Sequence, residues 1–203
     1  MMYGLPASTE LSKQLAKERV FAKFKVGSAA QELFNADIST MFIANHISEE
    51  TVPGLKSGKT VKGIYVLALN LKQPVCDAKN LALLAKMIPQ KMVFALFFDG
   101  KVQFAISHER LHLSELVPVD DAKLELRGTD LDEVWENLVK AIGNVVVEEG
   151  RTLEGQIEAN ELRKALERKI ECLTEKAYRE KQPRRKSELW GEIETLKRQL
   201  ENI

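Results

Sequence analysis

The sequence predicts an α+β fold: a mixed or antiparallel sheet with flanking helices over residues 1–150, followed by an antiparallel, coiled-coil-like helical hairpin over 151–203. Two observations carry this prediction. In the first part, β-prone runs, two of them joined by Asp99-Gly100, alternate with segments of helical spacing. From about Leu153 glycine and proline become rare and charged residues dominate, which is typical of solvent-facing helices.

The first third of the chain is expected to hold helices and strands in alternation. Ser8 or Thr9 can cap a short helix, and a second helix begins at Gly27-Ser28. Ser39–Ile47 is β-prone and is followed by a loop. The nearly continuous apolar run of Thr60–Lys72 predicts a strand that is buried on both faces.

A β-hairpin is the clearest local signal in the sequence. Its arms, Lys91–Phe98 and Lys101–Ser107, are β-prone, and Asp99-Gly100 suits a type I′ turn because both central residues need positive φ. A helix is expected before it, over 77–88, and another after it, from Asp130 to about Ile142. Short strands are expected at 117–119 and 123–126.

The C-terminal part carries two apolar stripes at helical spacing. Pro183 cannot sit inside a regular helix without removing a hydrogen bond, but it suits the first turn of a new helix. We therefore predict two antiparallel helices joined near Lys181–Arg185; a single kinked helix in an intermolecular coiled coil is the alternative. The stripes are Leu162, Leu166, Ile170, Leu173 and Ala177, then Leu189, Ile193, Leu196, Leu200 and Ile203.

Composition excludes several classes of function. Thirty basic and thirty acidic residues leave no net charge, so any binding to nucleic acid or lipid must come from a local patch. Cys76 and Cys172 lack companions at ligand spacing, so we expect no metal, no cofactor and a reducing, cytoplasmic location. The N-terminus lacks the pattern of a signal peptide, and the apolar stretch Met92–Phe98 is far shorter than the ~20 residues of a membrane helix.

One strand offers a catalytic alternative. The expected order of helix, strand, strand, helix, strand resembles nucleases of the PD-(D/E)xK type, in which an acidic residue two positions before a lysine binds a divalent metal. Here Asn70 stands in the acidic position before Lys72, and Glu49 and Glu50 lie in a loop. Because such a metal normally needs two or more carboxylates, the sequence favours a plain core strand, with an inactive nuclease fold as the alternative.

Basic residues gather where the two C-terminal helices should meet. Lys181, Arg184, Arg185 and Lys186 lie in or beside the expected turn, with Glu180 and Glu188 among them. Such a tip can bind an anionic partner, such as an acidic protein groove or a DNA backbone. The alternative is a solvated turn with ordinary ion pairs between neighbouring helical residues.

Three stretches together resemble a known bacterial family. They are Gly4–Thr9, the block from Ile88-Pro89 to Asp99-Gly100, and Glu180–Leu189 with its Lys-Gln-Pro-Arg-Arg-Lys segment. On these the chain is similar to the domain of unknown function 4391. The resemblance implies a protein encoded beside DNA methyltransferases and helicases in restriction-like defence systems. It carries over no catalytic residues.

From these observations we expect a non-catalytic accessory or interaction protein of a bacterial DNA-modification or restriction-like system. Its partner would be a protein, such as a methyltransferase or helicase subunit, and DNA is a further candidate. Two other functions remain open: an inactive PD-(D/E)xK-like fold, and a homodimeric scaffold without nucleic-acid contact.

Overall fold

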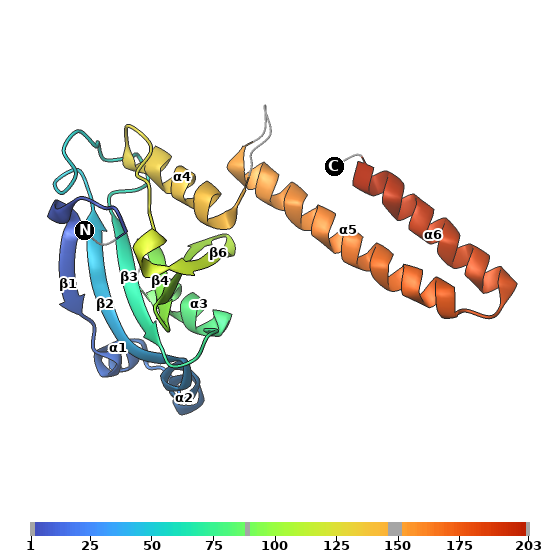
Figure 1. The fold of residues 1–203 in the computed structure, drawn as a ribbon, viewed down its shortest axis with the longest axis horizontal. Helices are drawn as coiled ribbons and strands as arrows, with labels where there is room; N and C mark the ends of the chain where they lie inside the picture. Colours follow the sequence, from blue (N-terminus) through green and yellow to red (C-terminus); the bar gives the residue numbers. More distant parts are fainter. Residues whose placement is uncertain (1–2, 88–89, 146–151, 202–203) are drawn as a thin grey trace. The chain divides into compact units, whose positions relative to one another are not determined.

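The computed structural model describes residues 3–87, 90–145 and 152–201 (Figure 1). The chain forms two compact units, residues 1–145 and 146–203. The first unit contains a mixed sheet with helices on its faces, and the second contains two helices packed together. The predicted α+β fold with a C-terminal helical hairpin is therefore confirmed.

In the described part of the first unit, six strands lie in chain order across one sheet. Neighbouring strands are antiparallel except for β3 and β4, which are parallel. A parallel pair needs a crossover, and α3 (Ala78–Met87) supplies it. The strands are β1 (Glu10–Gln14), β2 (Ile38–Ile47), β3 (Ile64–Leu71), β4 (Lys91–Phe98), β5 (Lys101–His108) and β6 (Arg110–Pro118).

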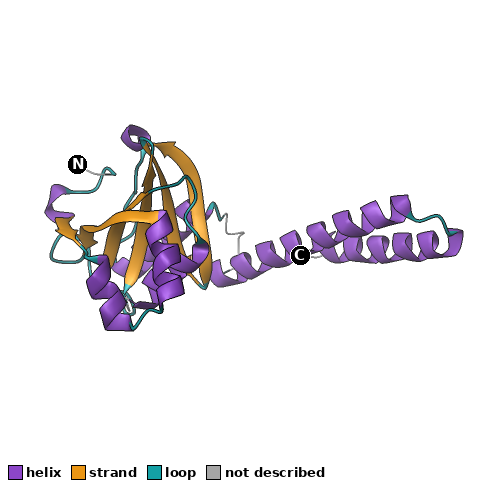
Figure 2. Ribbon diagram, turned by 90° about the horizontal axis from the view of Figure 1, so that it is seen from below, coloured by secondary structure: helices purple, strands orange, loops and turns teal. Residues whose placement is uncertain are grey.

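Helices cover both faces of this sheet (Figures 1 and 2). On one face α1 (Lys17–Phe24), α2 (Ser28–Asp37) and α3 share a core with β2, β3, β4 and Ala105 of β5. Helix α4 (Leu131–Gly143) packs against β5 and β6, where Trp135 contacts His108. Successive side chains of a strand point to opposite faces, so the side chains of Ala105 and His108 lie on different faces of the sheet. Helix α4 therefore covers the face opposite to α1, α2 and α3.

The β4–β5 connection has the predicted geometry. Asp99 and Gly100 have φ of 48° and 72°, and Phe98 pairs with Lys101 across the turn. Positive φ at both central residues is the type I′ conformation. As expected for arms at the centre of a sheet, Phe94 and Phe104 are buried.

The predicted first helix is wrong. Residues Ala7–Thr9 form a short 3-10 turn and Glu10–Gln14 form β1, with the helix starting only at Lys17. Every residue of β1 is exposed, so pairing with β2 rather than burial holds this edge strand. Hydrophobic periodicity could not reveal a strand that buries none of its side chains.

The strands predicted after β5 also need correction. A single strand, β6, spans Arg110–Pro118, and residues 123–126 form no strand. Along β6 His112 is buried while Leu113 and Leu116 are half exposed, so the usual alternation is absent. Instead of joining a ladder, Leu124 donates its backbone N–H to the carbonyl of Tyr3 at 2.9 Å.

The Asp132 carboxylate fixes the long connection between β2 and β3 against the start of α4. It accepts hydrogen bonds from the backbone N–H groups of Lys59 (2.6 Å) and Val61 (2.7 Å) and from the Thr60 hydroxyl (2.7 Å). Gly58 must lack a side chain, because a Cβ there would lie 2.5 Å from the Asp132 carboxyl carbon. These bonds, that of the Thr60 hydroxyl foremost, lower the pKa of Asp132 from its ordinary 3.8 to about 2.

The second unit consists of α5 (Leu153–Arg179) and α6 (Pro183–Glu201). Pro183 opens α6 as predicted, and the predicted stripes meet in a shared core, so the hairpin rather than a kinked single helix is confirmed. Leu162 is 52% exposed, and Ile203 lies outside the described residues. The seam contains Leu166, Ile170, Leu173, Ala177, Leu189, Ile193 and Leu196.

Among the described residues, no helix combines the length and the apolar composition that a membrane span requires.

The turn between β4 and β5 gives a first prediction. Gly100→Val should lower the free energy of unfolding by about 1–3 kcal/mol, because a β-branched residue resists positive φ. Gly100→Asn is the matched control, since asparagine tolerates this conformation, and it should retain most of the stability. Chemical denaturation measures both variants. Equal stability of the valine variant and the native protein would contradict the turn assignment.

The Asp132 cap gives a pH-dependent prediction. A carboxyl whose pKa is depressed on folding stabilises the native state above its unfolded pKa, and this contribution disappears as pH falls through its folded pKa. Asp132→Asn should therefore lower the melting temperature at neutral pH, and the difference should vanish between about pH 4 and pH 2. Asp120→Asn, at an exposed position, is the control. A melting difference that persists unchanged at pH 2 would count against the cap.

Candidate functional site

The tip of the α5–α6 hairpin is built by a short turn with defined hydrogen bonds. Helix α5 ends where the Glu180 N–H donates to the Lys176 carbonyl at 2.9 Å. The Glu180 carboxylate then accepts from the backbone N–H of Gln182 at 2.8 Å, just before Pro183 opens α6. This bond, with smaller contributions from the Lys181 N–H and the Arg185 guanidinium, lowers the pKa of Glu180.

A pocket of about 820 Å³ opens at this tip. Of the predicted partner-binding residues, Lys181 and Arg185 line it together; Arg184 and Lys186 lie next to it in α6 and do not line it. The complete lining is Lys176, Arg179, Glu180, Lys181, Gln182, Arg185, Glu188, Leu189 and Glu192.

The acidic residues of this pocket are already engaged within the hairpin. Glu180 holds the turn, Glu188 accepts from Arg184 at 3.3 Å, and Glu192 pairs with Lys169 at 3.1 Å. Within the part of the chain that the structure describes, no ion pair engages Lys176, Lys181 or Lys186. The tip therefore presents cations that are not fully compensated, and an anion can bind there.

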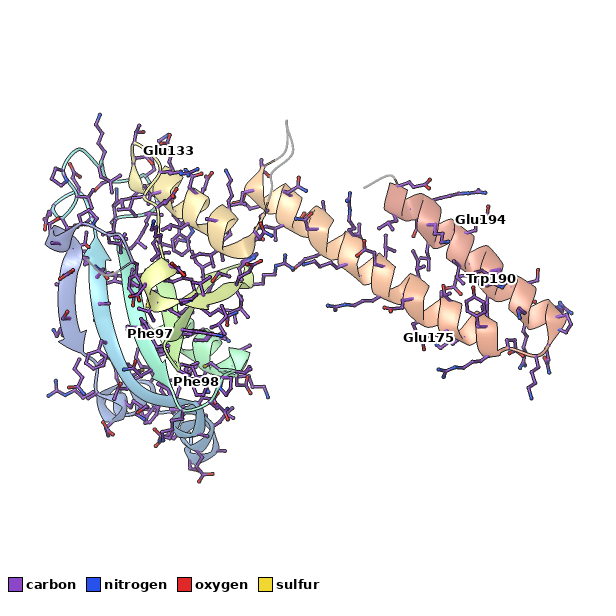
Figure 3. The ribbon with its side chains drawn as sticks, in the orientation of Figure 1. Phe97, Phe98, Glu133, Glu175, Trp190 and Glu194 are labelled. Atoms are coloured by element: carbon purple, nitrogen blue, oxygen red, sulfur yellow. The ribbon has the colours of Figure 1, made fainter. Side chains whose placement is uncertain are left out.

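A pair of exposed aromatic rings flanks the tip, and sequence reasoning missed it. The rings of Tyr178 and Trp190 meet edge to face, with centroids 5.6 Å apart and planes at 90°. Figure 3 shows Trp190 extending from α6 toward α5. Tyr178 is 70% exposed and Trp190 36%. The available signal was that each ring directly follows a residue of an apolar stripe, Ala177 or Leu189, and therefore points to the side of the hairpin core rather than into it.

The residues of the nuclease alternative have other partners. The Asn70 amide donates to the Thr40 hydroxyl at 2.7 Å, and the Lys72 ammonium donates to the Asn35 carbonyl at 2.7 Å. Asn70 also lines a mainly apolar pocket of about 400 Å³ on the sheet, with Phe42 and Phe97 among its walls. Of the two predicted loop acids, Glu49 accepts from the backbone N–H of Ser57 at 3.2 Å.

A residue with a carboxyl group that lies beside this strand end is Asp37, since the backbone N–H of Lys72 donates to the Asp37 carbonyl at 2.7 Å; the sequence reasoning overlooked it. It is buried, and it accepts hydrogen bonds from the backbone N–H of Asp77 and the side chain of Asn80, both at 2.7 Å. Asp37 thus ties the end of α2 to the start of α3. Among the described residues, no group of three or more histidine, cysteine, aspartate or glutamate side chains could hold a metal.

A family model covers nearly the whole chain and matches residues 3–200 with the description "Domain of unknown function (DUF4391)". The chain belongs to the DUF4391 family. Comparisons with curated proteins and with solved structures found no match. The tip segment Glu180–Leu189 lies within the range that matches DUF4391, so the resemblance expected from that segment is confirmed at the level of the family.

The side-chain partners of Asn70 and Lys72 give a prediction for this DUF4391 chain. Because Asn70 stands where the acidic ligand is expected, and no cluster of metal-ligating side chains is present among the described residues, we expect the purified protein to leave supercoiled plasmid DNA intact with Mg²⁺ or Mn²⁺. Gel electrophoresis over several hours measures this. Metal-dependent cutting that Lys72→Ala abolishes, and that Lys79→Ala leaves unchanged, would establish the nuclease alternative instead.

Proposed function

We propose that the protein is a non-catalytic interaction protein of a bacterial DNA-modification or restriction-like defence system, and that α5 and α6 form its docking arm. The supporting observation is the exposed Tyr178–Trp190 pair beside uncompensated cations at the tip. Aromatic rings and arginines contribute most to the energy of protein interfaces.

The hairpin seam supports this proposal. The apolar stripes of α5 and α6 pack against each other within one chain, and this buries Leu173, Ala177 and Ile193. A second copy of the chain therefore finds few apolar side chains to cover, and the homodimeric scaffold loses its main driving force. What remains exposed near the tip is aromatic and cationic.

The partner we propose is a protein with an acidic groove that accepts the two rings. A methyltransferase or helicase subunit encoded nearby is the expected candidate. The rings favour a protein over a duplex, since a DNA backbone offers phosphates but no apolar cleft for Trp190. Binding to DNA is therefore an alternative result of the test below.

The element order required by the nuclease alternative is present as α2, β2, β3, α3 and β4. Asn70 and Thr40 bond to each other at the position where a metal ligand would be needed. We keep an inactive nuclease-like fold as the second candidate for the first unit. It is compatible with a docking arm.

The test replaces Arg184, Arg185 and Lys186 with alanine in the full chain. The matched control replaces Arg163, Lys164 and Arg168 with alanine. These residues are exposed on α5, and their replacement removes the same amount of charge. Candidate subunits from neighbouring genes are purified, and affinity is measured by calorimetry. We expect the tip variant to bind at least tenfold more weakly, the control to bind normally, and both to melt like the native protein.

Other outcomes separate the alternatives. Equal affinity of the tip variant and the native protein for every partner would contradict the docking arm. If a duplex binds instead, three lost phosphate contacts should lower the slope of log affinity against log salt by about 0.9 each. Loss of a defined oligomer in the tip variant would support the homodimeric scaffold.

A further inference from the structure

A second concave site lies in the first unit, independent of the hairpin. A pocket of about 570 Å³ opens where β3 and β4 begin, and its walls come from β2, the residues before β3, α3, β4 and β5. Met92 and Phe94 are buried in its lining. This volume is within the range of small-molecule sites, roughly 300–1,000 Å³.

The charged groups of this pocket are all of one sign. Lys62 and Lys91 line it, and among the described residues neither an aspartate nor a glutamate does. The Lys62 ammonium donates to the Gly58 carbonyl at 2.7 Å, and the Lys91 ammonium lies 4.9 Å from the centre of the Trp135 ring. Within the described residues neither lysine has an ion pair, so both charges remain available to a ligand anion.

Two stacked rings form a rigid wall beside these lysines. The rings of His46 and Tyr65 are 4.3 Å apart and inclined by only 14°. Gly63 makes room for this stack, because a Cβ there would lie 2.8 Å from His46 Nε2. Ser107 adds a hydroxyl to the lining from β5.

The wall that contains Thr60 and Val61 is also fixed before any ligand arrives. Their backbone N–H groups bond to Asp132, which itself does not line the pocket. The segment that leads into Lys62 is therefore held in place. A site whose walls are preformed loses less conformational entropy on binding.

We propose that this pocket binds a phosphate-bearing molecule of mononucleotide size, with Lys62 and Lys91 as the groups that contact the phosphate. Two ammonium groups in a lining that contains no carboxylate among its described residues favour a compact anion over a neutral or cationic ligand. The phosphate can belong to a free nucleotide or to the 5′ end of a nucleic-acid strand. This inference does not depend on the docking arm.

Calorimetry on the full chain tests the proposal with AMP, inorganic phosphate and adenosine as probes. We expect AMP to bind and adenosine, which lacks the phosphate, to show no binding. Lys62→Gln and Lys91→Gln should each weaken AMP binding roughly tenfold, because each removes a charged hydrogen-bond donor. Lys101→Gln, at an exposed position outside the pocket, is the matched control and should bind AMP like the native protein.

Lys91→Arg keeps the charge and should retain most of the affinity, which separates a loss of contact from a loss of fold. The affinity for a 5′-phosphorylated oligonucleotide is compared with that for its unphosphorylated form and with that for AMP. If the phosphorylated strand binds more tightly than both, the bound phosphate belongs to a strand end. Absence of AMP and phosphate binding at about 1 mM would overturn the proposal. So would equal AMP affinity of both glutamine variants and the native protein.

Discussion

The position of β3 between β2 and β4 is the constraint on which the first unit depends. This strand is antiparallel to one neighbour and parallel to the other, so the chain must return through α3 before β4 can form. The buried Asp37 holds the beginning of that return, because it joins the end of α2 to Asp77 and Asn80 at the start of α3. Since β3 is apolar on both faces, other elements must cover both of them.

The second unit depends on a different interaction, the apolar seam between α5 and α6. Closing this seam within one chain removes most apolar side chains from the surface, and the exposed rings and cations then lie at the turn. The two proposed sites share one electrostatic feature: each has basic side chains that, among the described residues, no nearby acidic side chain neutralises by an ion pair. In the tip the acidic residues are held by internal partners, and no acidic residue is among the described residues that line the pocket of the first unit.

Much of this fold could be predicted from local patterns. The turn residues Asp99 and Gly100 determined the β4–β5 hairpin, and the two apolar stripes with Pro183 determined the helical hairpin. The edge strands could not be predicted, because β1 buries none of its side chains and β6 lacks regular alternation.

The candidate sites were only partly predictable, since charge clusters can be read from adjacent residues whereas pockets cannot. Lys181 and Arg185 are close in sequence, and they meet in the structure as expected. By contrast, Lys62 and Lys91 come from separate segments that only the parallel β3–β4 pair brings together. Tyr178 and Trp190 likewise meet only when the hairpin closes.

The central claim is that the protein acts through the tip of its helical hairpin. Hydrogen–deuterium exchange of the full chain, alone and bound to a purified partner subunit, tests this claim directly. A docking arm predicts slower exchange concentrated in residues 176–190, with the strands of the first unit unchanged. Protection confined to the first unit, with unchanged exchange at the tip, would contradict it.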